Sequence, residues 1–247
     1  MDAIMTVGFE LRLAGTVLTL LLTGCAAAPT QPTPGDPWER VNRAVFRFND
    51  TGDRAVVKPV AQAWERHVPR FVRTGVGNLL DHLGLTTTIV NDLLQLKLGA
   101  TVTDLGRFLV NSTVGLGGLL DPASSAGVPK NDEDFGQTLG RWGIGPGPYL
   151  VLPFLGPSTL RDGIGRAGDT QTDLRVQLDL ELEERLALAG LTVVDQRAAL
   201  LPADAALDAA FDRYAFVRDA WLQRREFLVR DGDVEPEDLS LDDPGED

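Results

Sequence analysis

The chain is short of the residues that build covalent and metal-centred scaffolds. It has one cysteine and two histidines in 247 residues, which excludes an intramolecular disulfide framework, a multi-cysteine zinc site and a histidine-rich metal centre. Basic residues are also scarce, since 23 lysines and arginines face 36 acidic residues and give a net charge of −13. That balance argues against nucleic acid as the main partner, because phosphate binding needs a basic face.

The sequence also has no long hydrophobic run. The uncharged run near the N-terminus is short. Residues 13–24 are uncharged and would span roughly 18 Å as a helix, too little for a bilayer core of about 30 Å. That length is typical of a secretory signal. The run ends at Leu22-Thr23-Gly24-Cys25, which resembles a bacterial lipobox and predicts Cys25 as a lipid anchor. The alternative is that Cys25 is a buried cysteine at the end of a core helix. The residues before the uncharged run are acidic, whereas the start of a signal peptide is usually basic.

Composition divides the chain into four parts. Residues 1–24 are the expected signal peptide, and 25–35 form a Pro/Thr-rich tether with little to pack. Residues 36–232 are the expected globular domain. Residues 233–247 are an acidic tail that we expect to be disordered. Residues 231–247 alone hold nine acids and no base, so the body itself is nearly balanced in charge.

Helical spacing of apolar residues dominates the body. Asp36-Pro37 predicts a capped helix start, Lys58-Pro59 a second start, and Pro69 the start of a helix over 70–83. Further helices are predicted over 86–98 and 100–110, and a long final helix from Leu201-Pro202 that carries Phe211 and stops at Gly232. No sustained two-residue alternation occurs. The predicted fold class is therefore all-α, a single multi-helix domain.

Residues 112–168 differ from the rest, because they are dense in glycine and proline and yet strongly apolar. Two interpretations stay open. The segment is a buried irregular connection whose backbone groups find partners inside, or it lies at a lipid interface or lines a cavity.

No catalytic motif stands out. Residues 156–160 lack the second glycine of a nucleophile elbow, and 143–147 lack the spacing of a phosphate loop. His67 and His82 have no evident nucleophile partner. The acids Asp132-Glu133-Asp134 either gather a cation or start a helix, and the second is favoured. We predict no catalytic residue, no metal site and no cofactor.

The first helix carries a basic stripe in a locally positive region, since 36–73 hold eight basic residues against five acids. Its arginines recur three and four residues apart, beside large aromatic residues. This pattern indicates either a helix at a membrane interface or an ordinary solvated face. The residues concerned are Trp38, Arg40, Arg43, Phe46, Arg47 and Phe48.

Several long motifs in the same order resemble the MlaA (VacJ) family of outer-membrane lipoproteins, over nearly all of 36–232. They are Asp36–Arg43, Phe46–Asp50, Asn91–Gln95, Asp104–Gly115, Glu133–Gly140, Gly147–Pro153, Gly156–Asp162, Asp212–Tyr214 and Arg218–Arg225. The resemblance implies a ring-like helical body in the inner leaflet of the outer membrane of a Gram-negative bacterium, lipid-anchored and facing the periplasm. It implies phospholipid as the transported molecule, withdrawn from the outer leaflet to keep the membrane asymmetric. It also implies a porin trimer and a periplasmic lipid carrier of the Mla system as partners, with no enzymatic activity. The alternative is a structural lipoprotein that scaffolds porins or the envelope without moving lipid.

With this resemblance, lipid contact becomes the favoured interpretation of the irregular segment. We expect apolar walls for acyl chains from Phe135, Trp142, Tyr149, Leu150, Leu152, Phe154 and Leu155. We expect headgroup contacts from Asn111, Ser112, Thr113, Gln137 and Thr138. Gly143, Gly145 and Gly147 would permit movement of a gate.

Overall fold

The computed structural model describes residues 33–233. The predicted signal peptide and Cys25 lie outside these residues, as do nearly all of the predicted tether and acidic tail. The described chain is mainly helical, as predicted, and its one sheet is a two-stranded hairpin. The elements are α2 (Glu39–Gly52), the π-helix η1 (Asp53–Val57), α3 (Lys58–His67), α4 (Arg70–Leu94), α5 (Leu98–Thr113), α6 (Pro122–Ser125), α7 (Phe135–Arg141), β1 (Tyr149–Leu152), β2 (Gly156–Thr159), α8 (Leu160–Asp169), α9 (Leu174–Gln177), α10 (Leu182–Leu200), the 3-10 helix η2 (Leu201–Ala203), α11 (Asp204–Ala209) and α12 (Arg213–Val229).

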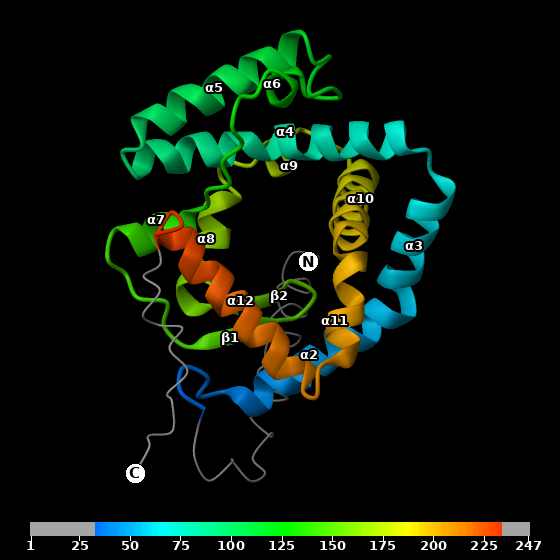
Figure 1. The fold of residues 1–247 in the computed structure, drawn as a ribbon, viewed down its shortest axis with the longest axis vertical. Coiled ribbons are helices and arrows are strands. Elements are labelled where there is room, and N and C mark those ends of the chain that lie inside the picture. Colours follow the sequence, from blue (N-terminus) through cyan, green and yellow to red (C-terminus); the bar gives the residue numbers. More distant parts are fainter. Residues whose placement is uncertain (1–32, 234–247) are drawn as a thin grey trace, which may run out of the picture.

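The elements are arranged as a ring (Figure 1). Helix α4 runs along one side with α5 packed antiparallel on its outer face, and α3 and α10 lie side by side on the next. Helix α2 and the hairpin form the far side, and α12 returns across to α7 and α8. The ring-like helical body that the resemblance implies is therefore confirmed.

Four predicted helix boundaries are wrong. Residues 70–83 and 86–94 belong to one helix, α4, and the joint before α5 lies at 95–97 rather than at Gly99. The predicted final helix is interrupted at 210–212, where the Asp212 carboxylate accepts the Tyr214 and Ala215 amides and caps α12. Asp36 does not cap α2, because its side chain is buried in tertiary contacts instead.

A small aromatic core joins the hairpin to α2 and α12. Tyr149, Val151 and Tyr214 are buried there, with Phe46 and Trp221 packed against them. Asn42 on α2 fixes the first strand, since its amide donates to the Tyr149 carbonyl (3.0 Å) and accepts the Val151 amide (2.9 Å). The same amide also donates to Asp36 at 2.7 Å. One buried asparagine thus holds strand β1 against α2.

The hairpin lies inside the segment predicted to be irregular. Its strands pair antiparallel, with Tyr149 opposite Thr159 and Leu152 opposite Gly156. Phe154 at the turn has a φ of +63°, a conformation costly for a side chain of this size. Two bonds with Asn49 hold it, one from Asn49 to the Leu152 carbonyl and one from the Phe154 amide, both 2.9 Å. The turn therefore presents a phenylalanine that is 85% exposed.

Candidate functional site

The distribution of polar and apolar side chains is inverted relative to a water-soluble domain. Within residues 33–233, only eight hydrophobic residues are buried, and seventeen polar or charged residues are. Large hydrophobic side chains are instead exposed on nearly every helix. Soluble monomers do not expose so much contiguous apolar surface. Large apolar side chains of this ring therefore lie more on its exterior than in its interior.

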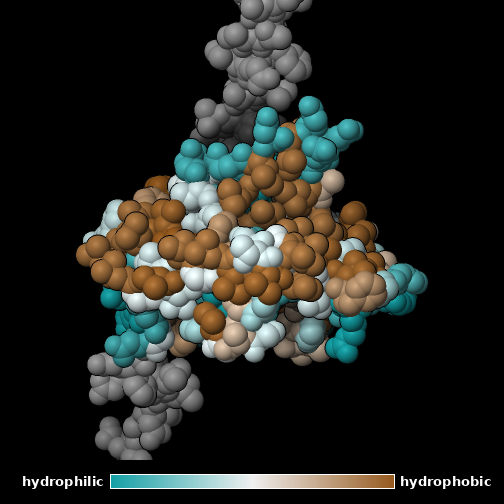
Figure 2. Space-filling model, turned by 90° about the horizontal axis from the view of Figure 1, so that it is seen from above, coloured by the Kyte–Doolittle hydropathy of each residue, from teal (hydrophilic) through white to brown (hydrophobic). Residues whose placement is uncertain are grey.

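Helix α5 shows this exterior most directly. Val102, Leu105 and Leu109 recur at helical spacing and are all exposed, and the connection that follows exposes Leu116 and Leu119. Figure 2, seen from the α5 side, shows the hydrophobic side chains as a band across the molecule, with hydrophilic patches above and below it.

Helix α10 adds a second apolar element. The stretch Leu182–Ala209 is long and apolar enough to cross a membrane by length and composition, and only 6% of its most apolar window is buried. Its exposed side chains include Leu182, Leu186 and Val193.

Beneath the apolar exterior, polar side chains tie α4 to α7. The Thr138 hydroxyl donates to Asn91 at 2.8 Å, and the Gln95 amide donates to Thr138 at 3.1 Å and to Glu133 at 2.8 Å. The Asn91 amide reaches Asp169 at the end of α8 (3.2 Å). Hydrogen bonds of this kind are strong where water is excluded, so they fix three helices in one arrangement.

A buried arginine joins α12 to α7 and α8. The Arg225 guanidinium donates to Asp134 with two bonds of 2.6 Å and to Asp162 at 2.8 Å. Burial alone would raise the pKa of Asp134, but the bonds from Arg225 outweigh it and hold that pKa below its usual value. Asp134 also caps α7 by accepting the Gln137 amide at 2.8 Å. The acid cluster at 132–134 thus starts a helix, the favoured sequence interpretation.

Helices α7 and α8 cross at backbone contact. A Cβ on Gly165 would lie 2.4 Å from the Gly136 nitrogen, and a Cβ on Gly136 would lie 2.4 Å from Arg225 and 2.5 Å from Asp162. Only glycine fits at both positions, so this crossing is set by the absence of side chains.

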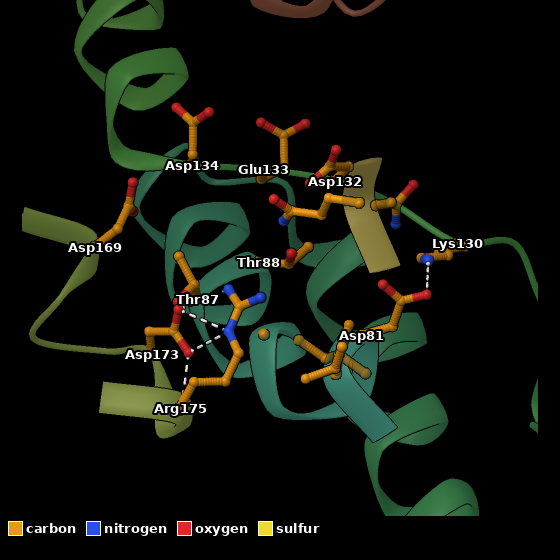
Figure 3. Close-up of a pocket in the computed structure, with 15 residues that line it drawn as sticks. Asp81, Thr87, Thr88, Lys130, Asp132, Glu133, Asp134, Asp169, Asp173 and Arg175 are labelled. Atoms are coloured by element: carbon orange, nitrogen blue, oxygen red, sulfur yellow. Dashed lines mark hydrogen bonds and ion pairs between the residues drawn. The ribbon is translucent and has the colours of Figure 1, made fainter. Parts of the chain in front are cut away.

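A polar pocket of about 320 Å³ opens beside α4 and is lined mainly by charged groups (Figure 3). Asp173 pairs with Arg175 at 2.6 Å and Asp81 pairs with Lys130 at 2.6 Å. Burial raises the pKa of Asp169 to about 6. The pocket offers both carboxylates and cations, and its two cations are paired with carboxylates. Its lining residues are Leu80, Asp81, Gly84, Leu85, Thr87, Thr88, Lys130, Asn131, Asp132, Glu133, Asp134, Asp169, Asp173, Arg175 and Gln196.

The polar residues predicted to meet a headgroup lie mostly inside the protein. Asn111 is buried and donates to Asp121 at 3.0 Å, and Gln137 and Thr138 are buried in the α4–α7 contact. Ser112 contacts the His82 ring at 3.1 Å, and Thr113 is exposed at the end of α5.

The apolar residues predicted to meet acyl chains fall into two groups. Phe154, Leu155 and Trp142 are exposed, and Trp142 packs edge-on against Phe135 with ring centroids 6.0 Å apart. Leu150 and Leu152 are half-buried, whereas Tyr149 belongs to the aromatic core. The predicted gate glycines, Gly143, Gly145 and Gly147, all lie in the exposed connection between α7 and β1.

The predicted interface stripe on α2 is split. Trp38, Arg40, Arg47 and Phe48 are exposed, and Phe48 meets Phe154 edge-on at 5.2 Å between centroids. Phe46, by contrast, packs on the core. Arg43 pairs with Glu39 and with Asp212, both at 2.7 Å, and lies over the Tyr214 ring. Arg43 and Phe46 are thus structural, and the other four remain on the surface beside the hairpin turn.

The charged residues that organise the interior escaped prediction. Arg225, Asp92, Asp104 and Arg107 all lie in the family-like motifs, yet none was singled out. A sequence signal existed for Asp92, Asp104 and Arg107, because each is an ionisable residue beside apolar ones on a helix, a costly position that implies a partner. Arg225 stands in a charged run and gave no such signal.

Comparison with known proteins gives a consistent match. A family model described as "MlaA lipoprotein" matches residues 34–228. The "Intermembrane phospholipid transport system lipoprotein MlaA" of Shigella flexneri and that of Escherichia coli (strain K12) are each 36% identical to this chain over 237 residues, covering 93% of both proteins. The protein of the same name from Haemophilus influenzae is 31% identical over 239 residues, with 92% of this chain and 96% of that protein covered. A solved structure described as "Structural basis for maintenance of bacterial outer membrane lipid asymmetry" is similar with a TM-score of 0.71 and 34% identity, covering 78% of this chain and 98% of that one.

Proposed function

Because this chain belongs to the MlaA lipoprotein family, we propose that it is a component of an intermembrane phospholipid transport system that maintains lipid asymmetry in the outer membrane. In this role it withdraws phospholipid mislocalised to the outer leaflet and passes it toward the periplasm. The proteins named for this activity align with nearly the whole chain.

The observation that carries the proposal is the inverted surface. Exposed leucine, valine and phenylalanine side chains surround the ring, while its buried residues are mainly polar. Each fully exposed aliphatic side chain loses about 1.5–3 kcal/mol when left in water rather than in an apolar medium. A body of this kind is stable in a lipid leaflet, with α5 and α10 facing acyl chains.

The proposed lipid path uses the exposed part of the predicted set. Phe154 and Leu155 at the hairpin turn and Trp142 beside Gly143 offer apolar contact to acyl chains. Leu152 ends strand β1, two residues before Phe154. The charged pocket of Figure 3 would receive the headgroup, so the path is amphipathic.

Anchoring and partners complete the proposal. Acylation of Cys25 would hold the protein at the outer membrane, because several acyl chains at about 0.8 kcal/mol per buried CH₂ give firm attachment. A porin trimer and a soluble periplasmic lipid carrier are the proposed partners. The carrier would accept the lipid on the periplasmic side.

A reconstituted transfer assay tests the function. The full chain in proteoliposomes should deliver fluorescent phospholipid to a soluble acceptor, and gently extracted protein should carry phospholipid detectable by mass spectrometry. Leu152→Asp should slow transfer while the protein still folds. Porin association without transfer would replace this proposal by the structural alternative, a scaffold for porins or the envelope.

The anchor has a separate test. Cys25→Ala should abolish acylation and move the protein out of the outer-membrane fraction. Unchanged fractionation would refute the lipobox assignment and leave the transport proposal standing.

A further inference from the structure

Two aspartates meet in the interior where α4 and α5 pack against each other. Asp92 on α4 and Asp104 on α5 are both 0% exposed. Asp104 contributes to the raised pKa of Asp92, so the two carboxyl groups are close neighbours in the contact between α4 and α5. Two carboxylates in one dry site repel strongly, and such a pair persists only with a positive charge or a proton between its members.

Few hydrogen-bond donors contact the carboxylate oxygens of Asp92 and Asp104. Among the described residues, neither Asp92 oxygen has a hydrogen-bond partner, and neither does Asp104 Oδ1. Asp104 Oδ2 accepts the Asn131 amide at 2.8 Å. Buried carboxylate oxygens in native proteins are almost always paired, so three without partners point to a missing group.

A neutral side chain adds an independent oxygen. Gln137 on α7 is 2% exposed, and its Nε2 donates to the Asp132 carbonyl at 2.9 Å. Its Oε1 has no partner within the described chain. Asp92 and Gln137 line the same cavity of about 460 Å³, together with Asn131 and Glu133, which leaves room for water molecules beside them.

The nearest cation does not fill this need. Lys97 donates to Glu133 at 2.9 Å and also binds Asp231, so its ammonium serves two other carboxylates. Burial and the neighbouring Asp104 raise the pKa of Asp92 to about 7, with Lys97 opposing the shift only weakly. Lys130, which also lines the cavity, pairs with Asp81 at 2.6 Å, so both ammonium groups are engaged by carboxylates other than Asp92 and Asp104.

We propose that Asp92, Asp104 and Gln137 bind a divalent cation of the calcium type. Calcium takes six to eight oxygen ligands at about 2.3–2.6 Å, and it accepts carboxylates, side-chain amides and water together. The three side chains supply four oxygens, and water in the adjoining cavity supplies the rest. A single shared proton would satisfy only two of those four oxygens. The bound ion would tie α4, α5 and α7 together at one point, whether or not the protein moves lipid.

Calcium binding to the full chain in detergent tests this proposal. Protein treated with EDTA and dialysed should bind about one equivalent of Ca²⁺ in isothermal titration, and CaCl₂ should raise its unfolding temperature. Asp104→Asn should weaken Ca²⁺ binding more than about 100-fold, since even an outer-shell change costs about 10–100-fold in metal affinity. Asp179→Asn, at an exposed position, is the matched control and should bind as the wild type does.

A second variant keeps the test decisive if Asp104→Asn does not fold. Gln137→Glu places a third carboxylate at the site, so it should lower the unfolding temperature in EDTA and tighten Ca²⁺ binding. The proposal is overturned if neither CaCl₂ nor MgCl₂ binds or stabilises the wild type, or if Asp104→Asn retains wild-type affinity. Higher stability of Asp104→Asn in EDTA, with no response of the wild type to either cation, would assign a shared proton instead.

Discussion

Replacing Arg225 by methionine should destabilise the ring at the junction of α7, α8 and α12. The guanidinium is enclosed between Asp134, which caps α7, and Asp162 in the first turn of α8. Methionine preserves much of the volume but removes every bond to the two carboxylates. Asp162 stays buried and Asp134 half-buried without their common counter-charge.

The expected cost follows from that geometry. Removing one partner of a buried ion pair typically costs about 3–5 kcal/mol, because the remaining charge is uncompensated. For a chain of this size, each kcal/mol shifts the unfolding temperature by about 2–4 °C. Arg225→Met should therefore unfold about 6–20 °C below the wild type.

The assay is thermal unfolding of the full chain in detergent, followed by circular dichroism. Arg224→Met is the matched control, since Arg224 is the neighbouring arginine on α12 and is exposed. It should unfold within the range of an ordinary surface change, about 0.5 kcal/mol. Equal unfolding temperatures for the two variants would refute the proposed role of Arg225.

Acidification gives an independent check on the cause. In the wild type the pKa values of Asp134 and Asp162 lie below their usual range, so their contribution to stability is complete above about pH 4. In Arg225→Met the lowering effect of the guanidinium is gone, so desolvation raises the pKa values of Asp134 and Asp162. The folded variant then binds more protons than the unfolded chain. The variant should therefore gain stability relative to the wild type as the pH falls from 7 toward 5. A gap that stays constant over this range would show that lost packing, not charge, explains the defect.

Three further changes test other parts of the structure. Gly136→Ala places a methyl group against Arg225 and should cost about 1–3 kcal/mol in thermal unfolding, whereas Gly145→Ala, with open space around it, should not; equal effects would contradict the close helix crossing. Leu109→Lys puts a charge on the apolar exterior at a cost of about 2.5–3.5 kcal/mol in a bilayer, so alkaline extraction should release more protein from membranes than in the wild type. Asp121→Asn leaves Arg107, which is 3% exposed, without its carboxylate partner, and should lower the free energy of unfolding by about 3 kcal/mol at pH 7. The difference from the wild type should vanish as the pH falls toward 2, because Asp121 of the wild type is protonated there.

Sequence patterns predict a helix start well where residues within the same segment determine it. Pro69 marks the start of α4 correctly. Pro59 lies in the first turn of α3, but the predicted break there is absent, because α2 continues through the π-helix η1 into α3. Asp36 looked equally local, yet its carboxylate accepts bonds from Asn42 and from Tyr214, a residue 178 positions away. No pattern within one segment contains that partner.

The candidate site was harder to predict, because the usual meaning of hydrophobicity is reversed. Phe211 belongs to the apolar residues of the predicted final helix, and it is fully exposed. The break beside it had a visible cause in Asp212, a capping residue in the middle of the predicted helix. The motifs of the family resemblance were more informative, because they contain the polar residues that hold the interior together.

The scarcity of buried hydrophobic side chains has a thermodynamic consequence. Exposure of apolar surface raises the heat capacity on unfolding, and exposure of polar surface lowers it. Unfolding of this chain moves few apolar groups from the interior into water. Most of the buried apolar residues are Ala61, Leu80, Leu85 and the aromatic core. The heat-capacity increment should thus fall below the usual value of about 12–15 cal/mol/K per residue. Its stability curve is then flat, and the ring holds its shape with little change over the range of growth temperatures.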